Sequence, residues 1–272
     1  MARSLWTGSL SFGLVNVPIS LVSAVRDRDL HFRQLHASDG APIEVQRWCE
    51  KERKEVDWEE ITHGYELEDG GMVVVSDLEL QAIAPRRTRT IDIEQFVDLA
   101  DVDPIYFDHP YLLVPASSDD GAVRAYRLLS EVMARTERAA LGRFVMRAKE
   151  YLVIVRHREG ALTLTTMRFA DEVRDARKVD AATQKSHKPT RKQLDAAVSI
   201  IEELSTDWDP TDYKDRYRAR LKRVVDRKRK GETITVPDTP RAPEPVPDLM
   251  EALERTLAEL QDGGGKKKAT SG

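Results

Sequence analysis

The sequence predicts a β-rich protein with a barrel at its core and helices around it. Many short segments of alternating polar and apolar residues are separated by turn residues, a pattern that favours a barrel over a doubly wound sheet. The clearest of them, "YLVIVRH" and "ALTLTTMRFA", flank the turn Arg158-Glu159-Gly160 and predict a hairpin. A chain of 272 residues can bury about three quarters of its unfolded surface, so it needs neither disulfides nor a metal to fold.

The first strands are expected in "WTGSLSFGLVNVPIS", where the apolar residues change parity partway along. Trp6 and Phe12 share one parity, whereas the apolar residues from Val15 onward take the other. Because side chains alternate between the two faces of a strand, this change indicates a bulge, a bend or a new strand. We interpret the segment as two short strands or one bent strand, bent at Gly13, and we expect Trp6 and Phe12 in the core.

Further strands and helices are predicted along the rest of the first half. Two strands, Leu30–His36 and Ile43–Trp48, are expected around an Asp39-Gly40 turn. Ser76 and Glu79 form a capping box, so a short helix should begin there. The remaining predicted elements are a short helix in Val56–Tyr65, strands Met72–Val75, Thr90–Leu99 and Tyr111–Ala116, and a helix over Val123–Thr136.

The second half is predicted to be helical after a long basic loop, Asp171–Pro189. Thr190 caps a helix with an apolar stripe that runs to Leu204. A second amphipathic helix, marked by Tyr213, Tyr217, Leu221 and Val224, should end at Gly231. Five prolines between Pro237 and Pro247 then indicate a stiff, extended linker. A last short helix, Asp248–Leu260, and a flexible basic tail complete the prediction.

The location is predicted from cysteine usage and from missing apolar runs. Cys49 is the only cysteine, which excludes an intrachain disulfide and fits a reducing cytoplasm. The amino terminus lacks the apolar core of a leader, and no run reaches the ~18 apolar residues of a membrane helix. We therefore expect a soluble cytoplasmic protein without a membrane partner.

Charge is distributed very unevenly along the chain. The net charge is −4 for the whole protein. It is −12 over residues 1–120, +11 over residues 121–230 and −3 over residues 231–272. Concentrated positive charge can attract a polyanion even when the total is negative. The middle of the chain is therefore the candidate nucleic-acid surface, although the same charges also fit an ordinary solvated face.

The motifs of common catalytic sites are missing. The sequence has no G-x-x-x-x-G-K-[ST] loop, no G-x-G-x-x-G and no H-E-x-x-H. "GSLSFG" does not have the spacing of a nucleophile elbow. His31 and His36 have no ligand partners at metal-binding spacing, and no second cysteine accompanies Cys49. We therefore expect no metal and no cofactor, and an enzyme is the weaker hypothesis.

Several segments together carry a resemblance to a known family. "WTGSLSFGLVNVPISLVSA" is similar, almost position for position, to the amino terminus of bacterial Ku proteins. The likeness continues, in order over roughly residues 3–231, through "GYELEDGGMVVVSDLEL", "DVDPIYFDHPYLLVP", "RFVMRAKEYLVIVR", "TLTTMRFADEVR" and "STDWDPTDYKDRYRARL". Some relatives carry a Cys-x-x-Cys near the position of Cys49; here Glu50, Lys51 and Glu52 follow, so no metal is carried over.

The resemblance implies a fold and a function. Two β-barrels with flanking helices, extended bridges and C-terminal helical arms would form a homodimeric ring around duplex DNA. Such a ring binds linear double-stranded DNA ends in non-homologous end joining and recruits and stimulates the ATP-dependent multidomain DNA repair ligase, in the cytoplasm at the nucleoid. The implied domains are a barrel with its DNA-encircling bridge (1–189), a dimerisation arm (190–231) and a Pro-rich linker with a short helix and tail (232–272).

Site residues are expected in the basic middle of the chain. A protein that grips any broken end must contact phosphates through Lys and Arg, because it cannot read bases. In "LGRFVMRAK", Arg143 and Arg147 are expected on one face of a strand, opposite Phe144 and Met146. The expected DNA-binding residues are Arg143, Arg147, Arg156, Arg158, Arg168, Arg174, Arg177, Lys178, Lys185, Lys188, Arg191 and Lys192.

The resemblance also implies a dimer interface at Tyr213, Tyr217 and Leu221, in the predicted arm. Two functional classes stay open. The first is a non-catalytic clamp on DNA ends. The second is a metal-dependent nuclease, which would need clustered carboxylates to hold divalent ions.

Overall fold

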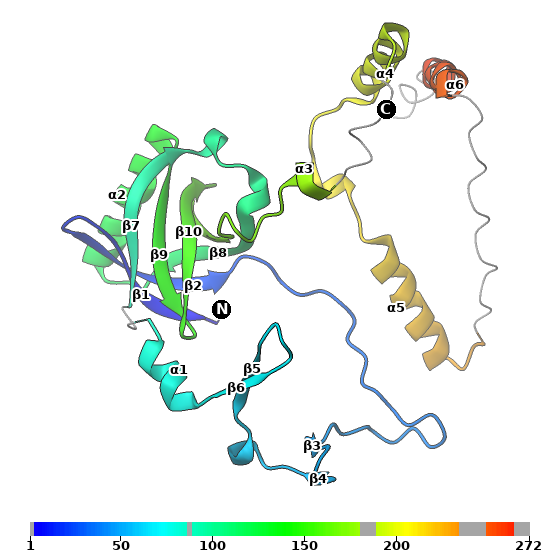
Figure 1. Cartoon of the computed structure of the whole chain (residues 1–272). Coiled ribbons are helices and arrows are strands. Elements are labelled where there is room, and N and C mark those ends of the chain that lie inside the picture. Colours follow the sequence, from blue (N-terminus) through cyan, green and yellow to red (C-terminus); the bar gives the residue numbers. More distant parts are fainter. Residues whose placement is uncertain (1–2, 86–88, 180–188, 234–248, 264–272) are drawn as a thin grey trace. The chain divides into compact units, whose positions relative to one another are not determined.

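The computed structural model describes residues 3–85, 89–179, 189–233 and 249–263 (Figure 1). The chain forms two compact units, one made of Met1–Arg28 and Phe32–Asp175 and the other of Asp29–His31 and Ala176–Gly272. The first unit holds a closed β-barrel, and the second consists of helices joined by extended segments. Among the described helices, none is long and apolar enough to cross a membrane.

Seven strands form the barrel in the first unit (Figure 1). Their order around it is β1-β2-β8-β11-β10-β9-β7, and all neighbours are antiparallel except β1 and β7. The parallel pair, with Leu10 opposite Ile91, closes the sheet. The predicted barrel is therefore confirmed. The strands are β1 (Trp6–Phe12), β2 (Val15–Ser23), β7 (Thr90–Asp98), β8 (Phe107–Pro115), β9 (Arg138–Met146), β10 (Lys149–Arg158) and β11 (Ala161–Met167).

The parity change near the amino terminus is explained by a hairpin between β1 and β2. Phe12 pairs with Val15 across the two residues Gly13 and Leu14. With this spacing, the residues that pair have opposite parity, so the inward-facing positions switch from even to odd. Gly13 has a φ of +58°, the sign that a type II′ turn requires at its first central position. The expected bend at Gly13 is therefore a turn between two strands rather than a bend within one.

The hairpin of β9 and β10 turns one residue earlier than the alternating sequence indicates. Met146 pairs with Lys149, so the loop consists of Arg147 and Ala148. Both have positive φ, +53° and +63°, as in a type I′ turn. The prediction that Arg147 lies on the strand is therefore wrong, because the alternation of polar and apolar residues in the sequence continues past the end of the strand into the turn. The next predicted hairpin, between β10 and β11, is confirmed with Glu159-Gly160 at its turn.

Helix α2 (Asp120–Thr136) packs on the barrel and is tied to it by a buried tyrosine. Leu129 and Met133 join the barrel's hydrophobic core. The Tyr126 hydroxyl donates to the Leu113 carbonyl at 2.7 Å and accepts from the Leu162 N–H at 2.8 Å. Burial raises the pKa of Tyr126, so the phenol remains a donor at neutral pH. This contact joins α2 to β8 and β11, and the predicted helix is confirmed.

The two aromatic residues expected in the core of the first hairpin lie at its edge. Trp6 and Phe12 are half-buried and pack against the core cluster. The Trp6 ring meets the Phe144 ring edge-on at 5.5 Å between centroids, and Phe12 meets Phe96 at 6.3 Å. Both residues therefore pack against the hydrophobic core, in the structural role that was expected of them.

The segment between β2 and β7 is less regular than predicted. Residues Leu30–His36 and Ile43–Trp48 form no strands, apart from the first residue of β3 at Trp48 and an isolated bridge between Leu35 and Pro42. These residues are exposed, so their alternating pattern has no apolar surface to pack on. The capping box of Ser76 is confirmed. The segment contains β3 (Trp48–Cys49), β4 (Lys54–Glu55), the 3-10 turn η1 (Trp58–Glu60), β5 (His63–Glu66), β6 (Met72–Val75) and α1 (Asp77–Ile83), followed past β7 by η2 (Leu99–Asp101) and η3 (Pro104–Tyr106).

The helix predicted for Val56–Tyr65 is wrong in most of its length. Only the three residues of η1 are helical, and Tyr65 belongs to β5, where it pairs with Val73 of β6. A helix of about ten residues is marginal without a surface to pack on, so the strand pairing of Tyr65 prevails.

The second unit contains the helices predicted for the carboxyl-terminal part. Thr190 caps α4 as expected, with its hydroxyl and the Gln193 side chain forming a capping box. Tyr213 precedes α5 rather than lying within it, because Asp215 is the N-cap. The predicted linker from Pro237 to Pro247 and most of the tail lie outside the described residues. The elements are α3 (Ala176–Val179), α4 (Arg191–Leu204), η5 (Pro210–Asp212), α5 (Arg216–Arg229) and α6 (Leu249–Gly263), which packs on α4.

Replacing Tyr126 with Phe should lower the free energy of unfolding by about 2–3 kcal/mol, because the change leaves a buried carbonyl and a buried N–H without their partner. Urea unfolding followed by circular dichroism measures the change. The matched control is Tyr65→Phe, whose side chain is 67% exposed and should have little effect. Equal stability of the two variants would contradict a structural role for the Tyr126 hydroxyl.

Candidate nucleic-acid interface

Three of the predicted DNA-binding arginines share the outer face of β9 and β10. Val153 and Val155 point into the core, so the even-numbered residues of β10 point outward. Arg156 and Arg158 are among these even-numbered residues. Arg143 lies on the same face of β9, opposite Leu152. The strand pairing therefore brings together residues that are 15 positions apart in the sequence.

Acidic residues of neighbouring strands balance part of this charge. Arg143 forms ion pairs with Glu94 of β7 at 3.0 Å and with Glu150 of β10 at 3.2 Å. Arg158 pairs with Glu159 at 3.3 Å in the adjacent turn. Because such pairs are partly exposed, they stabilise the barrel only weakly, but they lower the positive potential that a phosphate would meet.

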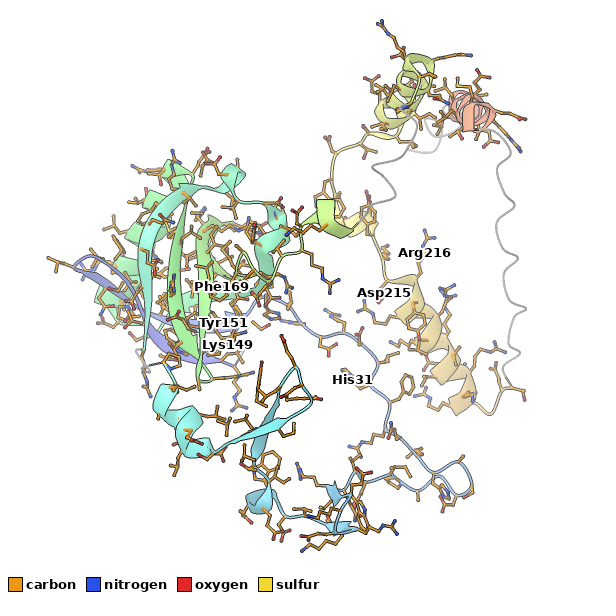
Figure 2. All side chains as sticks on the ribbon, in the orientation of Figure 1. His31, Lys149, Tyr151, Phe169, Asp215 and Arg216 are labelled. Carbon is orange, nitrogen blue, oxygen red and sulfur yellow. The ribbon has the colours of Figure 1, made fainter. Side chains whose placement is uncertain are left out.

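Arg147 occupies the tip of the β9–β10 hairpin and is exposed. Next to it, the Lys149 ammonium lies over the Tyr151 ring, 5.2 Å from its centroid (Figure 2). Burial raises the pKa of the Tyr111 phenol, and the nearby positive charge of Arg147 opposes this rise. The hairpin tip thus presents two cations next to two tyrosines of the barrel.

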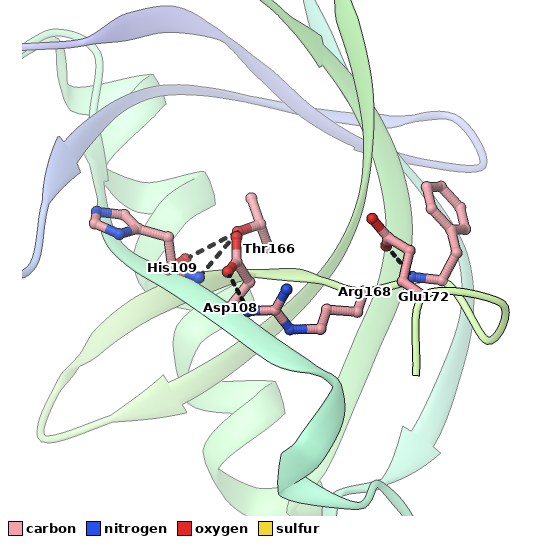
Figure 3. A network of polar contacts seen from close by, with 6 residues as sticks. Asp108, His109, Thr166, Arg168 and Glu172 are labelled. Atoms are coloured by element: carbon pink, nitrogen blue, oxygen red, sulfur yellow. Dashed lines mark hydrogen bonds and ion pairs between the residues drawn. The ribbon is translucent and has the colours of Figure 1, made fainter. Parts of the chain in front are cut away.

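Arg168 belongs to a polar network at the end of β11 (Figure 3). Its guanidinium donates to Asp108 at 2.9 Å, and both side chains are about half exposed. The Thr166 hydroxyl, which is buried, accepts from the His109 N–H at 3.0 Å and reaches the Asp108 carboxylate at 3.3 Å. Asp108 therefore orients Arg168 and offsets its charge. Nearby, the Phe169 N–H donates to Glu172, which fixes the chain as it leaves the barrel.

Three of the predicted arginines in the first unit keep their charge unbalanced, namely Arg147, Arg156 and Arg174. None of the three forms an ion pair with any residue that the structure describes. Arg147 and Arg174 are exposed, and Arg156 is half-buried on the outer face of β10. Sequence analysis could not separate these residues from Arg143 and Arg168, because the carboxylate partners come from other strands. Glu94, Glu150 and Asp108 are the residues that it missed.

The remaining predicted cations belong to the second unit. Lys178 is exposed in α3, which also contains Arg177. Arg191 is exposed at the first turn of α4, whereas Lys192 pairs with Glu254 of α6 at 3.0 Å. Lys185 and Lys188 lie outside the described residues. Four of the six predicted cations of the second unit therefore lie on helices, and one of them, Lys192, is paired with a carboxylate.

The predicted dimer residues combine exposure with apolar character. Tyr213 and Tyr217 are 71% and 68% exposed, and Leu221 is half-buried on the same side of α5 as Tyr217. Tyr213 stacks on Trp208 at 4.9 Å between ring centroids, and Trp208 is itself 73% exposed. Sequence analysis missed Trp208 as part of this surface, although it lies in the same quoted segment.

The barrel carries an apolar groove of its own. It lies between α2 and the β1–β2 hairpin, has a volume of about 530 Å³, and is lined by Phe12, Phe96, Leu128 and Val132, among others. Leu128 is 67% exposed. Exposed apolar surface of this kind is typical of protein contacts.

Residues that could hold a metal do not gather in the part of the chain that the structure describes. No group of three or more His, Cys, Asp or Glu side chains is found there. Cys49 is a half-buried free thiol, and the His36 ring contacts the Asp39 carboxylate at 3.1 Å.

Comparisons with known proteins point to one family. A family model described as the Ku70/Ku80 beta-barrel domain matches residues 11–196. Over 265 residues the chain is 39% identical to non-homologous end joining protein Ku 1 of Saccharopolyspora erythraea, covering 97% of this chain and 81% of that protein. It is 38% identical to the protein Ku of Anaeromyxobacter sp. (99% and 90% covered) and 36% identical to that of Bacillus subtilis (94% and 81%).

The chain therefore belongs to the Ku family. The closed barrel, the family-model match and the near full-length relatives all support this conclusion. The resemblance inferred from the quoted segments is confirmed. Ku proteins are a non-enzymatic family, and this membership decides against the nuclease alternative.

Proposed function

We propose that this protein binds the ends of double-stranded DNA during non-homologous end joining, as a homodimer that encloses the duplex. The observation that carries the proposal is the set of arginines of the first unit without an ionic partner among the described residues, Arg147, Arg156 and Arg174. Unpaired guanidinium groups, one on the sheet and two in segments that adjoin it, suit phosphate contacts, which give affinity without base preference. The family membership supports the same function, because the curated relatives are named non-homologous end joining proteins.

The remaining predicted residues take secondary parts in this proposal. Arg143, Arg158 and Arg168 are oriented by carboxylates and contribute mainly to the local field. The bridge that encircles the duplex would use Arg177, Lys178, Lys185, Lys188, Arg191 and Lys192. In this scheme residues 1–189 form the barrel and bridge, 190–231 the dimerisation arm, and 232–272 a spacer with a short helix.

Dimerisation would join the arm of one protomer to the barrel of its partner. Tyr217 and Leu221 give α5 an apolar stripe, and the groove next to α2 offers an apolar surface that it could fill. A two-fold axis would repeat the contact and close the ring.

The ligase belongs to the same proposal. An end-binding clamp joins nothing by itself, so a DNA repair ligase must act at the end that it holds. The segment 232–272, rich in proline and then in leucine, has the composition of a spacer with a docking helix. We assign to it the recruitment and stimulation of the ATP-dependent multidomain ligase, at the nucleoid in the cytoplasm.

Linear duplex should bind tightly whatever its overhang, and covalently closed circles of equal length should not compete. A closed ring can load only where a duplex ends, although both DNAs present the same phosphate lattice. Competition assays with labelled linear DNA measure this difference, and cutting the circle with a nuclease should restore competition. Circles that compete as well as linear DNA would exclude a threading ring.

Arg147→Gln should reduce the magnitude of the salt dependence of DNA binding, whereas Arg143→Gln should leave it nearly unchanged. Each lost phosphate contact lowers the magnitude of the slope of log affinity against log salt concentration by about 0.9. The loss of the contact also weakens binding several-fold at physiological salt. The two variants have the same net charge, so Arg143→Gln is a matched control for the general field. Fluorescence anisotropy at several salt concentrations gives both slopes, and equal slopes would remove Arg147 from the interface.

Leu128→Glu should raise the dimer dissociation constant at least ten-fold, because dimerisation would then bury an unpaired carboxylate. The side chain is 67% exposed, so the protomer should still fold. Analytical ultracentrifugation measures the effect. Leu78→Glu, at a residue of α1 that is 77% exposed, is the control and should remain dimeric. A Leu128→Glu variant with parental dimerisation would place the interface elsewhere.

A further inference from the structure

Helix α5 has a concentration of positive charge that the dimer arm does not explain. Its 14 residues, "RYRARLKRVVDRKR", include eight Lys or Arg and one Asp. An arm that only packs against a protein surface needs its apolar stripe and has no need of this charge. Positive residues at i and i+4 also repel one another and destabilise an isolated helix.

The charge is arranged in a stripe next to the apolar one. At 3.6 residues per turn, Arg216, Arg220 and Arg223 share one side of the helix. Tyr217 and Leu221 lie about a third of a turn away, on the side proposed for the partner. The arginine stripe therefore remains outside that contact when the apolar stripe is covered.

These three arginines have no ionic partner in the described ranges. Arg218 pairs with Asp215 at 3.9 Å and Arg227 with Glu232 at 2.7 Å, and the charges of both are thus balanced. Asp215, next to Arg216 at the start of the helix (Figure 2), is already engaged as the N-cap and accepts from the Arg218 N–H at 2.8 Å. No carboxylate described in the structure pairs with Arg216, Arg220 or Arg223.

We propose that Arg216, Arg220 and Arg223 of α5 form a second site for the phosphate backbone of duplex DNA, separate from the barrel. The inference rests on the proposed end-binding function. The three residues span about 10 Å of helix at 1.5 Å per residue, and a DNA strand offers one phosphate about every 3.4 Å of duplex axis. Long arginine side chains can therefore reach consecutive phosphates of one strand.

A membrane surface suits the helix less well than duplex DNA. Interfacial helices present a broad apolar face of Trp, Phe and Leu. In α5 the apolar stripe is narrow, with Tyr217, Leu221 and Val224, and its sequence has arginine or lysine on both flanks. Anionic phospholipid vesicles nevertheless share the phosphate chemistry and serve as the alternative ligand in the test.

The test replaces Arg216, Arg220 and Arg223 together with Gln in the full chain. The slope of log affinity against log salt for linear duplex DNA should fall in magnitude by two to three, as expected for three lost phosphate contacts at about 0.9 each. The matched control replaces Arg124, Arg127 and Arg135, which are exposed on α2, with Gln. It has the same net charge and should keep the parental slope.

Three further measurements decide between explanations. A triple Arg→Lys variant at the α5 positions should bind with the parental slope; if it loses affinity as the Gln variant does, positive charge is not the cause and the proposal is wrong. Ultracentrifugation should find the Gln variant dimeric; if only its dimerisation is lost, the stripe belongs to the interface and the proposal is wrong. Binding to anionic vesicles that falls while DNA binding stays parental would likewise overturn it.

The linear-against-circular competition separates this inference from the proposed function. The α5 variant should still prefer linear DNA, because the ring remains closed. An unchanged salt slope with that preference intact would overturn the α5 site alone. If the parental protein binds circular and linear DNA equally, the proposed ring is wrong. The comparison of salt slopes between the parental protein and the α5 variant then still tests the α5 site.

Discussion

The barrel closes through a single parallel pairing between strands that are distant in the sequence. Three of its seven neighbour pairs are hairpins with two-residue turns, which form from local contacts. The pairing of β1 with β7, by contrast, requires the chain to leave the barrel after β2 and to return at Thr90. Without this pairing both strands would present open edges, which attract other chains. Gly8 allows the approach, because a Cβ at that position would lie 2.2 Å from the Arg89 carbonyl.

Closure also fixes which charges remain free. Regular pairing sets Arg143 of β9 between carboxylates of its two neighbouring strands, and the network of Asp108 does the same for Arg168 where β11 ends next to β8. Arg147 and Arg174 instead belong to a turn and a loop, where no described residue of a neighbouring strand pairs with them. Arg143 and Arg168 are thus balanced from neighbouring strands, whereas positive charge remains at Arg147 and Arg174 and, within β10, at Arg156. A nonspecific DNA-binding surface can arise from such a pattern without any dedicated pocket.

Local signals in the sequence were enough to predict much of this fold. Ser76 and Thr190 each bring a side-chain acceptor and a reciprocal Glu or Gln within one turn, so both helix starts are correct. The alternating pattern alone misplaced Arg147, because the pattern continues through the turn at Arg147 and Ala148. The same pattern suggested strands before Trp48, where the described residues offer no surface for a strand to pack on. The contact of Tyr126 with two strands was beyond prediction, since it depends on the closed barrel.

For the candidate site, the residue types were predictable and their partners were not. A basic middle of the chain follows directly from composition. Whether a given arginine is balanced depends on strand register, as for Arg143 with Glu94, which is 49 residues away in the sequence. The same limit applied to α5. The spacing of Arg216, Arg220 and Arg223 was visible in the sequence, but that no described carboxylate pairs with them was not.

The turn at Arg147 and Ala148 has a consequence for engineering this fold. Left-handed backbone costs a residue other than Gly or Asn roughly 1–2 kcal/mol, and both residues of the turn adopt it. Asn-Gly would suit the geometry better and would make the hairpin more stable. It would also remove the guanidinium from the tip. Thermostabilisation by consensus turn residues would therefore remove the cation that is proposed to contact phosphate at this hairpin. The strained pair is better left unchanged when the protein is optimised as a reagent.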